Sequence, residues 1–113
     1  MDCLFCNIVQ GKLNTEILHE DEHTLAFADI HPQAPTHLLI IPKKHLSTLN
    51  DLQDEDTLIA GQLIQTARKL AKSYGLADDG YRILMNCNEQ GGQSVYHIHM
   101  HLLGGRPMKW PPG

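Results

Sequence analysis

The residues best suited to chemistry are three histidines at alternate positions, His97, His99 and His101. In an extended strand alternate side chains share a face, so the three imidazoles are predicted to form a row about 6.6 Å apart at the backbone. The apolar residues between them would then point into the core. A single histidine is more often a structural residue, but three at period two on one face indicate a functional site.

Such a row suits two kinds of chemistry. Two histidines at i and i+2 can converge on one zinc ion, although the chain has no H-E-x-x-H motif and no acid on the same predicted strand. Alternatively, a neutral imidazole can act as a nucleophile on an anionic substrate, while a neighbouring imidazolium neutralises charge and delivers a proton.

The segment just before the histidines favours the anion. Gly91-Gly92-Gln93-Ser94 combines two glycines, which allow backbone N–H groups to approach a ligand closely, with an amide and a hydroxyl as further donors. By itself this segment is a simple turn, and no Gly-Lys-Ser/Thr follows it, so it is not a Walker loop.

Cys3 and Cys6 form a Cys-x-x-Cys pair, which has the spacing of half a tetrahedral zinc site. The alternative is that both are small hydrophobic residues of a terminal helix that pack under Phe5.

Apolar periodicity and turn residues predict two helices, one short at 3–10 and one long at 51–74. The expected strands are 16–19, 24–29, 37–42, 81–86 and 96–103. Asp54 is the predicted N-cap of the long helix. The stripe of that helix expected to pack on the sheet comprises Leu58, Leu63, Ile64, Ala67, Leu70 and Ala71. Short neighbouring strands with one long helix favour an α+β fold with an antiparallel sheet.

Composition narrows the classes of function. The length of 113 residues is expected to form one domain, 1–113. The net charge of −4 argues against non-specific binding of DNA or RNA. No apolar run approaches the roughly 20 residues of a membrane span, and no signal peptide is recognised, so the expected location is cytoplasmic.

The run His97-Ile98-His99-Met100-His101-Leu102-Leu103 matches the His-φ-His-φ-His-φ-φ signature and resembles the histidine triad (HIT) superfamily. The similarity extends to segments 27–30, 32–37, 41–45, 91–96 and 110–113. These segments are most similar to the nucleotide-binding (HINT) branch, the purine nucleoside phosphoramidases.

The resemblance implies a HIT-like fold whose two protomers form a homodimer with one continuous antiparallel sheet. It implies hydrolysis of the P–N bond of purine nucleoside 5′-phosphoramidates, including the AMP-lysine type, through a covalent nucleotidyl-histidine. The products are a nucleoside monophosphate and an amine, and catalysis needs no cofactor. The tail 104–113, including Trp110, would pack at the dimer interface and influence substrate choice.

The resemblance also implies roles for individual residues. His99 would be the nucleophile and His101 would contact the phosphate and the leaving group, with His37 and His97 completing the histidine cluster. The remaining nucleotide-binding residues divide by the part of the ligand that they would contact. Those implied are Asp29 for the ribose, Asn86, Gln93 and Ser94 for the phosphate or the scissile nitrogen, and Leu4, Phe5, Ile8, Phe27, Ile30 and Leu39 for the base.

Some bacterial members of the family carry a structural zinc site, whose ligands correspond here to Cys3, Cys6, His45 and His97. Other members lack the cysteines and work without a metal. Two other functions stay open: hydrolysis of dinucleoside polyphosphates, and a nucleotide- or zinc-binding interaction module with incidental turnover.

Overall fold

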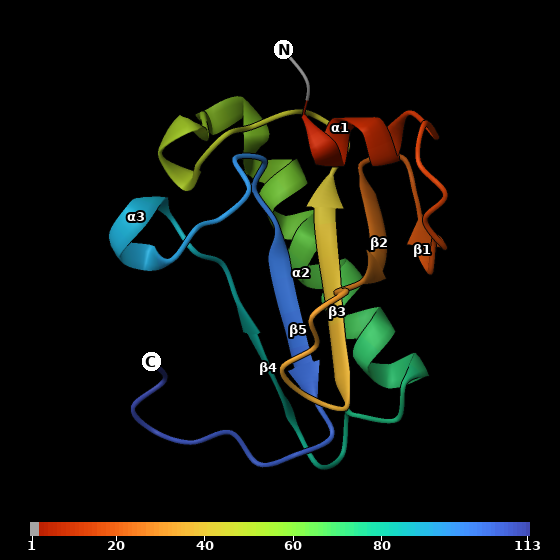
Figure 1. Ribbon diagram of the computed structural model, residues 1–113, viewed down its shortest axis with the longest axis vertical. Helices are drawn as coiled ribbons and strands as arrows, with labels where there is room; N and C mark the ends of the chain where they lie inside the picture. Colours follow the sequence, from red (N-terminus) through yellow and green to blue (C-terminus); the bar gives the residue numbers. More distant parts are fainter. Residues whose placement is uncertain (1–2) are drawn as a thin grey trace.

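A single antiparallel sheet carries the candidate site, with helices on both of its faces (Figure 1). The computed structural model describes residues 3–113. The strand order is β1-β2-β3-β5-β4. The strands are β1 His19–Glu20, β2 Thr24–Ala28, β3 Thr36–Pro42, β4 Tyr81–Leu84 and β5 Met100–Gly104. The helices are α1 Leu4–Val9, α2 Thr57–Ser73 and α3 Asn88–Gly91. The predicted α+β fold is confirmed.

Alternation along the strands divides the core between the two faces of the sheet. In Figure 1, α2 lies behind the sheet and α1 lies in front of its upper end. The buried residues on the α2 side include Ala26, Leu38, Ile40, Leu63, Ala67, Leu70, Ile98, Met100 and Leu102. Those on the α1 side are Phe5, Ile8, Leu25, Phe27, Leu39 and Ile41. The histidine side chains accompany the second group, as predicted from the alternation.

The predicted strand 96–103 is wrong at its start, because the strand begins only at Met100. Pairing of β5 with β3 begins at Ile40↔Met100. Before that point the Ile98 N–H donates to the Leu46 carbonyl at 2.8 Å, in the segment that follows β3. His97 and His99 therefore precede the sheet, but Ile98 between them is still buried against α2.

The long helix also begins later than predicted, at Thr57. The preceding residues form two 3-10 turns, Leu49–Asp51 and Asp54–Asp56. Asp56, not Asp54, is the residue before the helix, and its buried carboxylate accepts from Lys44 Nζ at 2.6 Å. Two residues of the predicted stripe face outward, since Leu58 is 65% exposed and Ile64 is 52% exposed.

Other boundaries shift by a few residues. The strand predicted at 16–19 is observed only at His19–Glu20, although the Leu18 N–H still donates to the Ala26 carbonyl at 2.8 Å. Gly104, predicted as the first residue of the tail 104–113, is the last residue of β5 and pairs with Thr36 and Tyr81. Within residues 3–113 no helix is long and apolar enough to cross a membrane.

Candidate functional site

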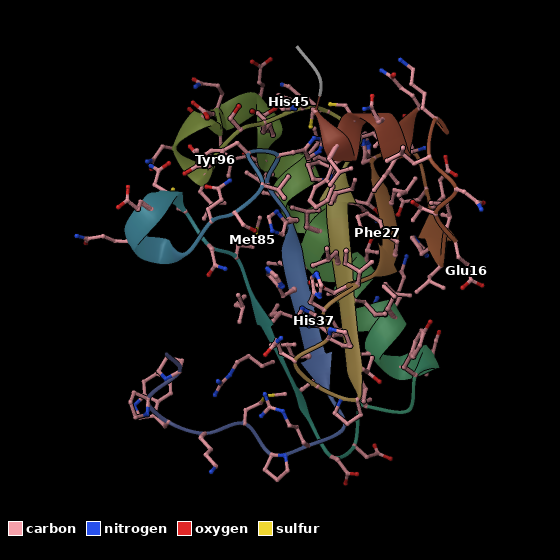
Figure 2. All side chains as sticks on the ribbon, viewed as in Figure 1. Glu16, Phe27, His37, His45, Met85 and Tyr96 are labelled. Carbon is pink, nitrogen blue, oxygen red and sulfur yellow. The ribbon has the colours of Figure 1, made fainter. Side chains whose placement is uncertain are left out.

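A cavity of about 340 Å³ opens on the α1 face of the sheet. Ten of the residues assigned to the site from the resemblance line it: Leu4, Phe5, Ile8, Phe27, Asp29, Ile30, Leu39, Ser94, His99 and His101. Five further lining residues were not predicted: Leu13, Thr15, Ala28, His31 and Val95. The volume lies in the range of small-molecule sites. Figure 2 shows Phe27 and His37 on this side of the sheet.

His99 is held with one ring nitrogen free. Its Nδ1 lies 2.9 Å from the backbone carbonyl of His97, and a carbonyl can only accept, so Nδ1 carries the proton. Nε2 then has the lone pair. Phe5 packs edge-on against the ring, with centroids 5.2 Å apart, and the side chain is only 7% exposed. This is the arrangement that a nucleophilic imidazole requires.

His101 is held in the opposite tautomer through His37. The Gln33 N–H donates to His37 Nδ1 at 3.0 Å, which leaves the His37 proton on Nε2. His37 Nε2 lies 2.9 Å from His101 Nδ1 and therefore donates to it. The proton of His101 is then on Nε2, the atom available to a ligand. One pocket thus contains an acceptor nitrogen on His99 and an N–H donor on His101.

Burial keeps the imidazole rings of His101 and His37 neutral. Desolvation, with smaller contributions from His99 and His37, lowers the pKa of His101 from 6.5 to about 4. Burial also lowers the pKa of His37, although the Asp29 carboxylate opposes the shift. The positively charged His101 expected for proton delivery is therefore not the form of the ligand-free protein at neutral pH. Binding of a phosphate anion beside His101 would favour its protonation.

Asp29 lines the cavity beside His37. Its Oδ1 accepts from the His31 N–H at 2.8 Å, and Oδ2 lies 3.4 Å from His37 Nε2. The carboxylate is 18% exposed, so it remains accessible to a ligand hydroxyl. Its position at the end of β2 fits the predicted ribose contact.

Two predicted ligands of the phosphate do not line the cavity. The amide of Gln93 is bound within the protein, because Nε2 donates to the carbonyls of Ser47 at 2.7 Å and Val95 at 3.0 Å. Its Oε1 accepts from the Asn88 N–H at 2.9 Å. Gln93 therefore fixes the shape of the segment that carries Ser94. Asn86 follows β4 and is also absent from the lining.

The glycine pair before Ser94 ends a helix and, contrary to the prediction, does not bring backbone N–H groups to a ligand. Gly91 is the last residue of α3, and Gly92 ends that helix in the left-handed conformation, with φ +81°. The N–H groups of Gly92 and Gln93 donate to the carbonyls of Glu89 and Asn88, both at 3.0 Å. These donors terminate a helix and do not face the cavity.

His97 belongs to a second cluster, with Cys3, Cys6 and His45. His97 Nδ1 lies 3.4 Å from Cys3 Sγ, 3.6 Å from Cys6 Sγ and 3.3 Å from His45 Nδ1. Cys6 Sγ lies 3.3 Å from His45 Nδ1. Bonds of about 2.0–2.1 Å to nitrogen and 2.3 Å to sulfur place tetrahedral ligands about 3.3–3.8 Å apart. The four ligand atoms therefore fit a zinc ion.

The rings of the cluster are oriented for metal binding. His97 Nε2 lies 2.8 Å from the Pro42 carbonyl and donates to it, so Nδ1 has its lone pair directed at the thiols. His45 Nε2 lies 3.2 Å from Ser47 Oγ, which can accept its proton. Figure 2 shows His45 at the end of the molecule where α1 lies.

Asp29, His37 and His101 also bring ligand atoms within 4.8 Å of one another. Here the ring nitrogens are unsuitable for a metal. The Gln33 N–H occupies the lone pair of His37 Nδ1, so His37 Nε2 carries a proton and has no lone pair for an ion. This group is a hydrogen-bonded relay, and the cysteine cluster is the better metal site.

Comparison with known proteins agrees with this geometry. A family profile described as the HIT domain matches residues 10–108. The purine nucleoside phosphoramidase of Escherichia coli (strain K12) is 49% identical over 107 residues, which cover 95% of this chain and 90% of that protein. The crystal structure of a HIT family hydrolase from Legionella pneumophila Philadelphia 1 is 56% identical, covers 99% of this chain and 100% of its own, and superposes with a TM-score of 0.97. A histidine triad protein from Clostridium difficile is 39% identical with a TM-score of 0.92, over 96% of this chain and 95% of its own. The chain belongs to the HIT family.

Proposed function

We propose that this protein is a purine nucleoside phosphoramidase that works through His99. The observation that carries the proposal is the pairing, in one cavity, of an unprotonated His99 Nε2 with a His101 Nε2–H donor. The 49% identity with a protein named for this activity supports it independently.

The chemistry follows from the two tautomers. His99 Nε2 attacks phosphorus, and the P–N bond breaks as its electron pair returns to the nitrogen. An amide anion is a poor leaving group, so the nitrogen must receive a proton and leave as a neutral amine. The donor is His101, protonated once the phosphate anion lies beside it, and it acts directly or through the Ser94 hydroxyl. Water then attacks the phosphorus of nucleotidyl-His99 and gives a proton to the now neutral His101. This step breaks the bond to His99 Nε2, releases the nucleoside monophosphate and restores the His99 imidazole.

The remainder of the cavity suits a purine nucleoside. Phe5 and Phe27 meet edge to face, with centroids 5.4 Å apart, and Leu4, Ile8 and Leu39 extend the apolar wall. The base end contains one side-chain hydroxyl, Thr15, and no carboxylate or amide side chain among its lining residues. A hydroxyl can donate or accept, so we expect both AMP- and GMP-type substrates to be hydrolysed.

We propose a structural zinc ion at Cys3, Cys6, His45 and His97. When bound it would cross-link α1, the segment after β3 and the segment before β5, and it would supply no step of the reaction. The backbone carbonyl of His97 orients His99, so the cluster supports the nucleophile. Metal analysis of untagged protein is expected to find about one zinc per chain. Cys3→Ser should release it, and less than a tenth of an equivalent in the wild type would refute the site.

We also propose that β4 pairs with β4 of a second copy to form a continuous sheet in a homodimer. β4 is an edge strand, and Ile83 and Met85 on the α2 side are only half-buried. Arg82 of β4 donates to the Lys109 carbonyl at 3.0 Å, which holds the tail along this edge. Trp110, 83% exposed, is then available to the partner.

Cys3, Cys6 and Cys87 form no disulfide within residues 3–113, which fits a reducing compartment such as the cytoplasm.

The decisive assay follows AMP release from adenosine 5′-phosphoramidate. His99→Ala is expected to lose at least three orders of magnitude in kcat/KM while retaining AMP binding, because only the nucleophile is removed. His23→Ala is a matched control, because this histidine does not line the cavity. Preferential hydrolysis of diadenosine tetraphosphate would favour the polyphosphate activity, and AMP binding without turnover would favour an interaction module.

A further inference from the structure

The N–H group that fixes the His37 ring belongs to Gln33, in the loop between β2 and β3. The carbonyl of the same residue accepts two hydrogen bonds from the Arg106 guanidinium, at 3.1 Å from Nε and 2.9 Å from Nη2. Arg106 Nη1 donates to the Pro107 carbonyl at 3.1 Å, which fixes the guanidinium relative to its own backbone. Arg106 lies outside the cavity and contacts none of its histidines in these bonds.

The segment around Arg106 is packed closely against the loop. Gly105 has φ +91°, and a Cβ placed on it would lie 2.9 Å from Pro35 Cβ. Only a glycine allows the chain leaving β5 to approach Pro35 so closely and then to direct Arg106 at Gln33. Two separate contacts therefore join the C-terminal segment to the loop.

We infer that Arg106 is a positioning residue for the reaction: it acts through the backbone of Gln33 and through His37 to fix the tautomer of His101. The contacts run from Arg106 to the Gln33 carbonyl, pass through the Gln33 Cα to its N–H, and continue from that N–H to His37 Nδ1 and from His37 Nε2–H to His101 Nδ1. Its kinetic consequence rests on the proposed phosphoramidase activity, whereas its structural consequence does not.

The guanidinium matters because the loop has few other constraints at this point. Within the loop the Gln33 side chain donates to the His31 carbonyl at 3.1 Å, and the His31 N–H donates to Asp29. Neither bond holds the Gln33 carbonyl. That carbonyl and the Gln33 N–H lie in successive peptide groups joined at the Gln33 Cα, so a carbonyl freed from Arg106 lets the backbone turn at this residue. If the N–H turns away as a result, His37 Nδ1 loses its donor and can carry the proton itself. His37 Nε2 then becomes an acceptor, the His101 proton moves to Nδ1, and no N–H remains for the leaving nitrogen.

The test combines nitrogen NMR of the histidine rings with kinetics. Long-range ¹H–¹⁵N correlation distinguishes Nδ1–H from Nε2–H imidazoles without any substrate. In the wild type, His37 and His101 are expected as Nε2–H tautomers. In Arg106→Ala both rings are expected as mixtures, with kcat/KM reduced about tenfold and millimolar guanidinium restoring part of the loss. Arg106→Lys should fall between the two, because an ammonium retains one charged donor but not the fork.

Two control variants separate positioning from general damage. Gln33→Ala retains the peptide N–H and carbonyl, so its tautomers and kcat/KM should match those of the wild type. Arg68→Ala removes an exposed arginine whose Nε donates to Gln65 at 2.9 Å, and it should have no effect.

The inference is refuted if Arg106→Ala keeps the wild-type tautomers of both rings, or if Gln33→Ala loses as much activity as Arg106→Ala. Should Arg106→Ala fail to fold, Arg106→Lys provides the same comparison. A wild type that does not hydrolyse phosphoramidates would refute the proposed activity, and the tautomers would still decide the role of Arg106.

Discussion

Burial of His101 makes the stability of the protein depend on pH in a calculable way. The folded-state pKa, about 4, lies below the ordinary value of 6.5, so the unfolded chain binds this proton more tightly. Stability from His101 is complete above about pH 7 and is lost as the pH falls from 6.5 towards 4. The test is therefore to acidify the wild type and His101→Asn and to compare how much free energy of unfolding each protein loses.

For these two pKa values, linkage gives a loss of about 2 kcal/mol in the free energy of unfolding between pH 8 and pH 5. Most carboxylates stay ionised throughout this window, so their titration contributes little. The Asn side chain does not titrate, and its Oδ1 can still accept from His37 Nε2. The variant is therefore expected to lose about 2 kcal/mol less than the wild type over the same range.

Urea denaturation at pH 8, 6.5 and 5, with equal metal content in each sample, measures this difference. The cluster that includes His45 and His97 is present in both proteins, so its own titration cancels. Ser94→Ala alters the same cavity without removing a titrating group, and it should retain the wild-type pH dependence. Equal losses in the wild type and in His101→Asn would contradict the reasoning.

Three further substitutions test the fold and the site. Gly104→Ala would place a Cβ 2.6 Å from Leu76 Cδ1, so urea denaturation should show a loss of about 1–3 kcal/mol. Burial raises the pKa of Asp21, but hydrogen bonds from His19 and from nearby N–H and O–H groups lower it well below 3.8 overall. Asp21→Asn should therefore lower stability by about 1–3 kcal/mol at pH 7, and its difference from the wild type should shrink as the pH falls below 3.8. Asp29→Asn should reduce kcat/KM about tenfold or more for ribonucleoside substrates and much less for 2′,3′-dideoxy substrates, because the ribose hydroxyls lose a charged acceptor.

β3 could be predicted from the sequence because its signal is local. Leu38 to Ile41 is a run of branched apolar residues closed by Pro42, which is typical of a strand buried on both faces, and β3 is observed at Thr36–Pro42. The start of β5 could not be predicted in this way. Residues 97–99 alternate like a strand, but the Leu46 carbonyl takes the Ile98 N–H, and this partner is set by the path of the chain after Pro42.

The residues of the site likewise include some that the sequence could predict and some that only the folded chain reveals. The apolar lining and the reactive histidines were accessible from residue types, spacing and resemblance. The role of Gln93 was not, because its type suits a phosphate ligand equally well, and only the folded loop brings Ser47 and Val95 to its amide. Leu13 and Thr15 were missed because they lie in an irregular stretch after α1. An apolar residue shortly after Gly11 was the available signal.

The division of labour among the histidines is set by backbone groups, not by the imidazoles themselves. The His97 carbonyl accepts a hydrogen bond from His99, the Pro42 carbonyl accepts one from His97, and the Gln33 N–H donates one to His37. Each partner determines which nitrogen of its ring is left free, and therefore whether that ring attacks, donates or coordinates. The three carriers of these backbone groups lie on separate segments of the chain. The geometry of the loops around β3 and β5 must therefore be retained for chemistry even where their side chains touch no substrate.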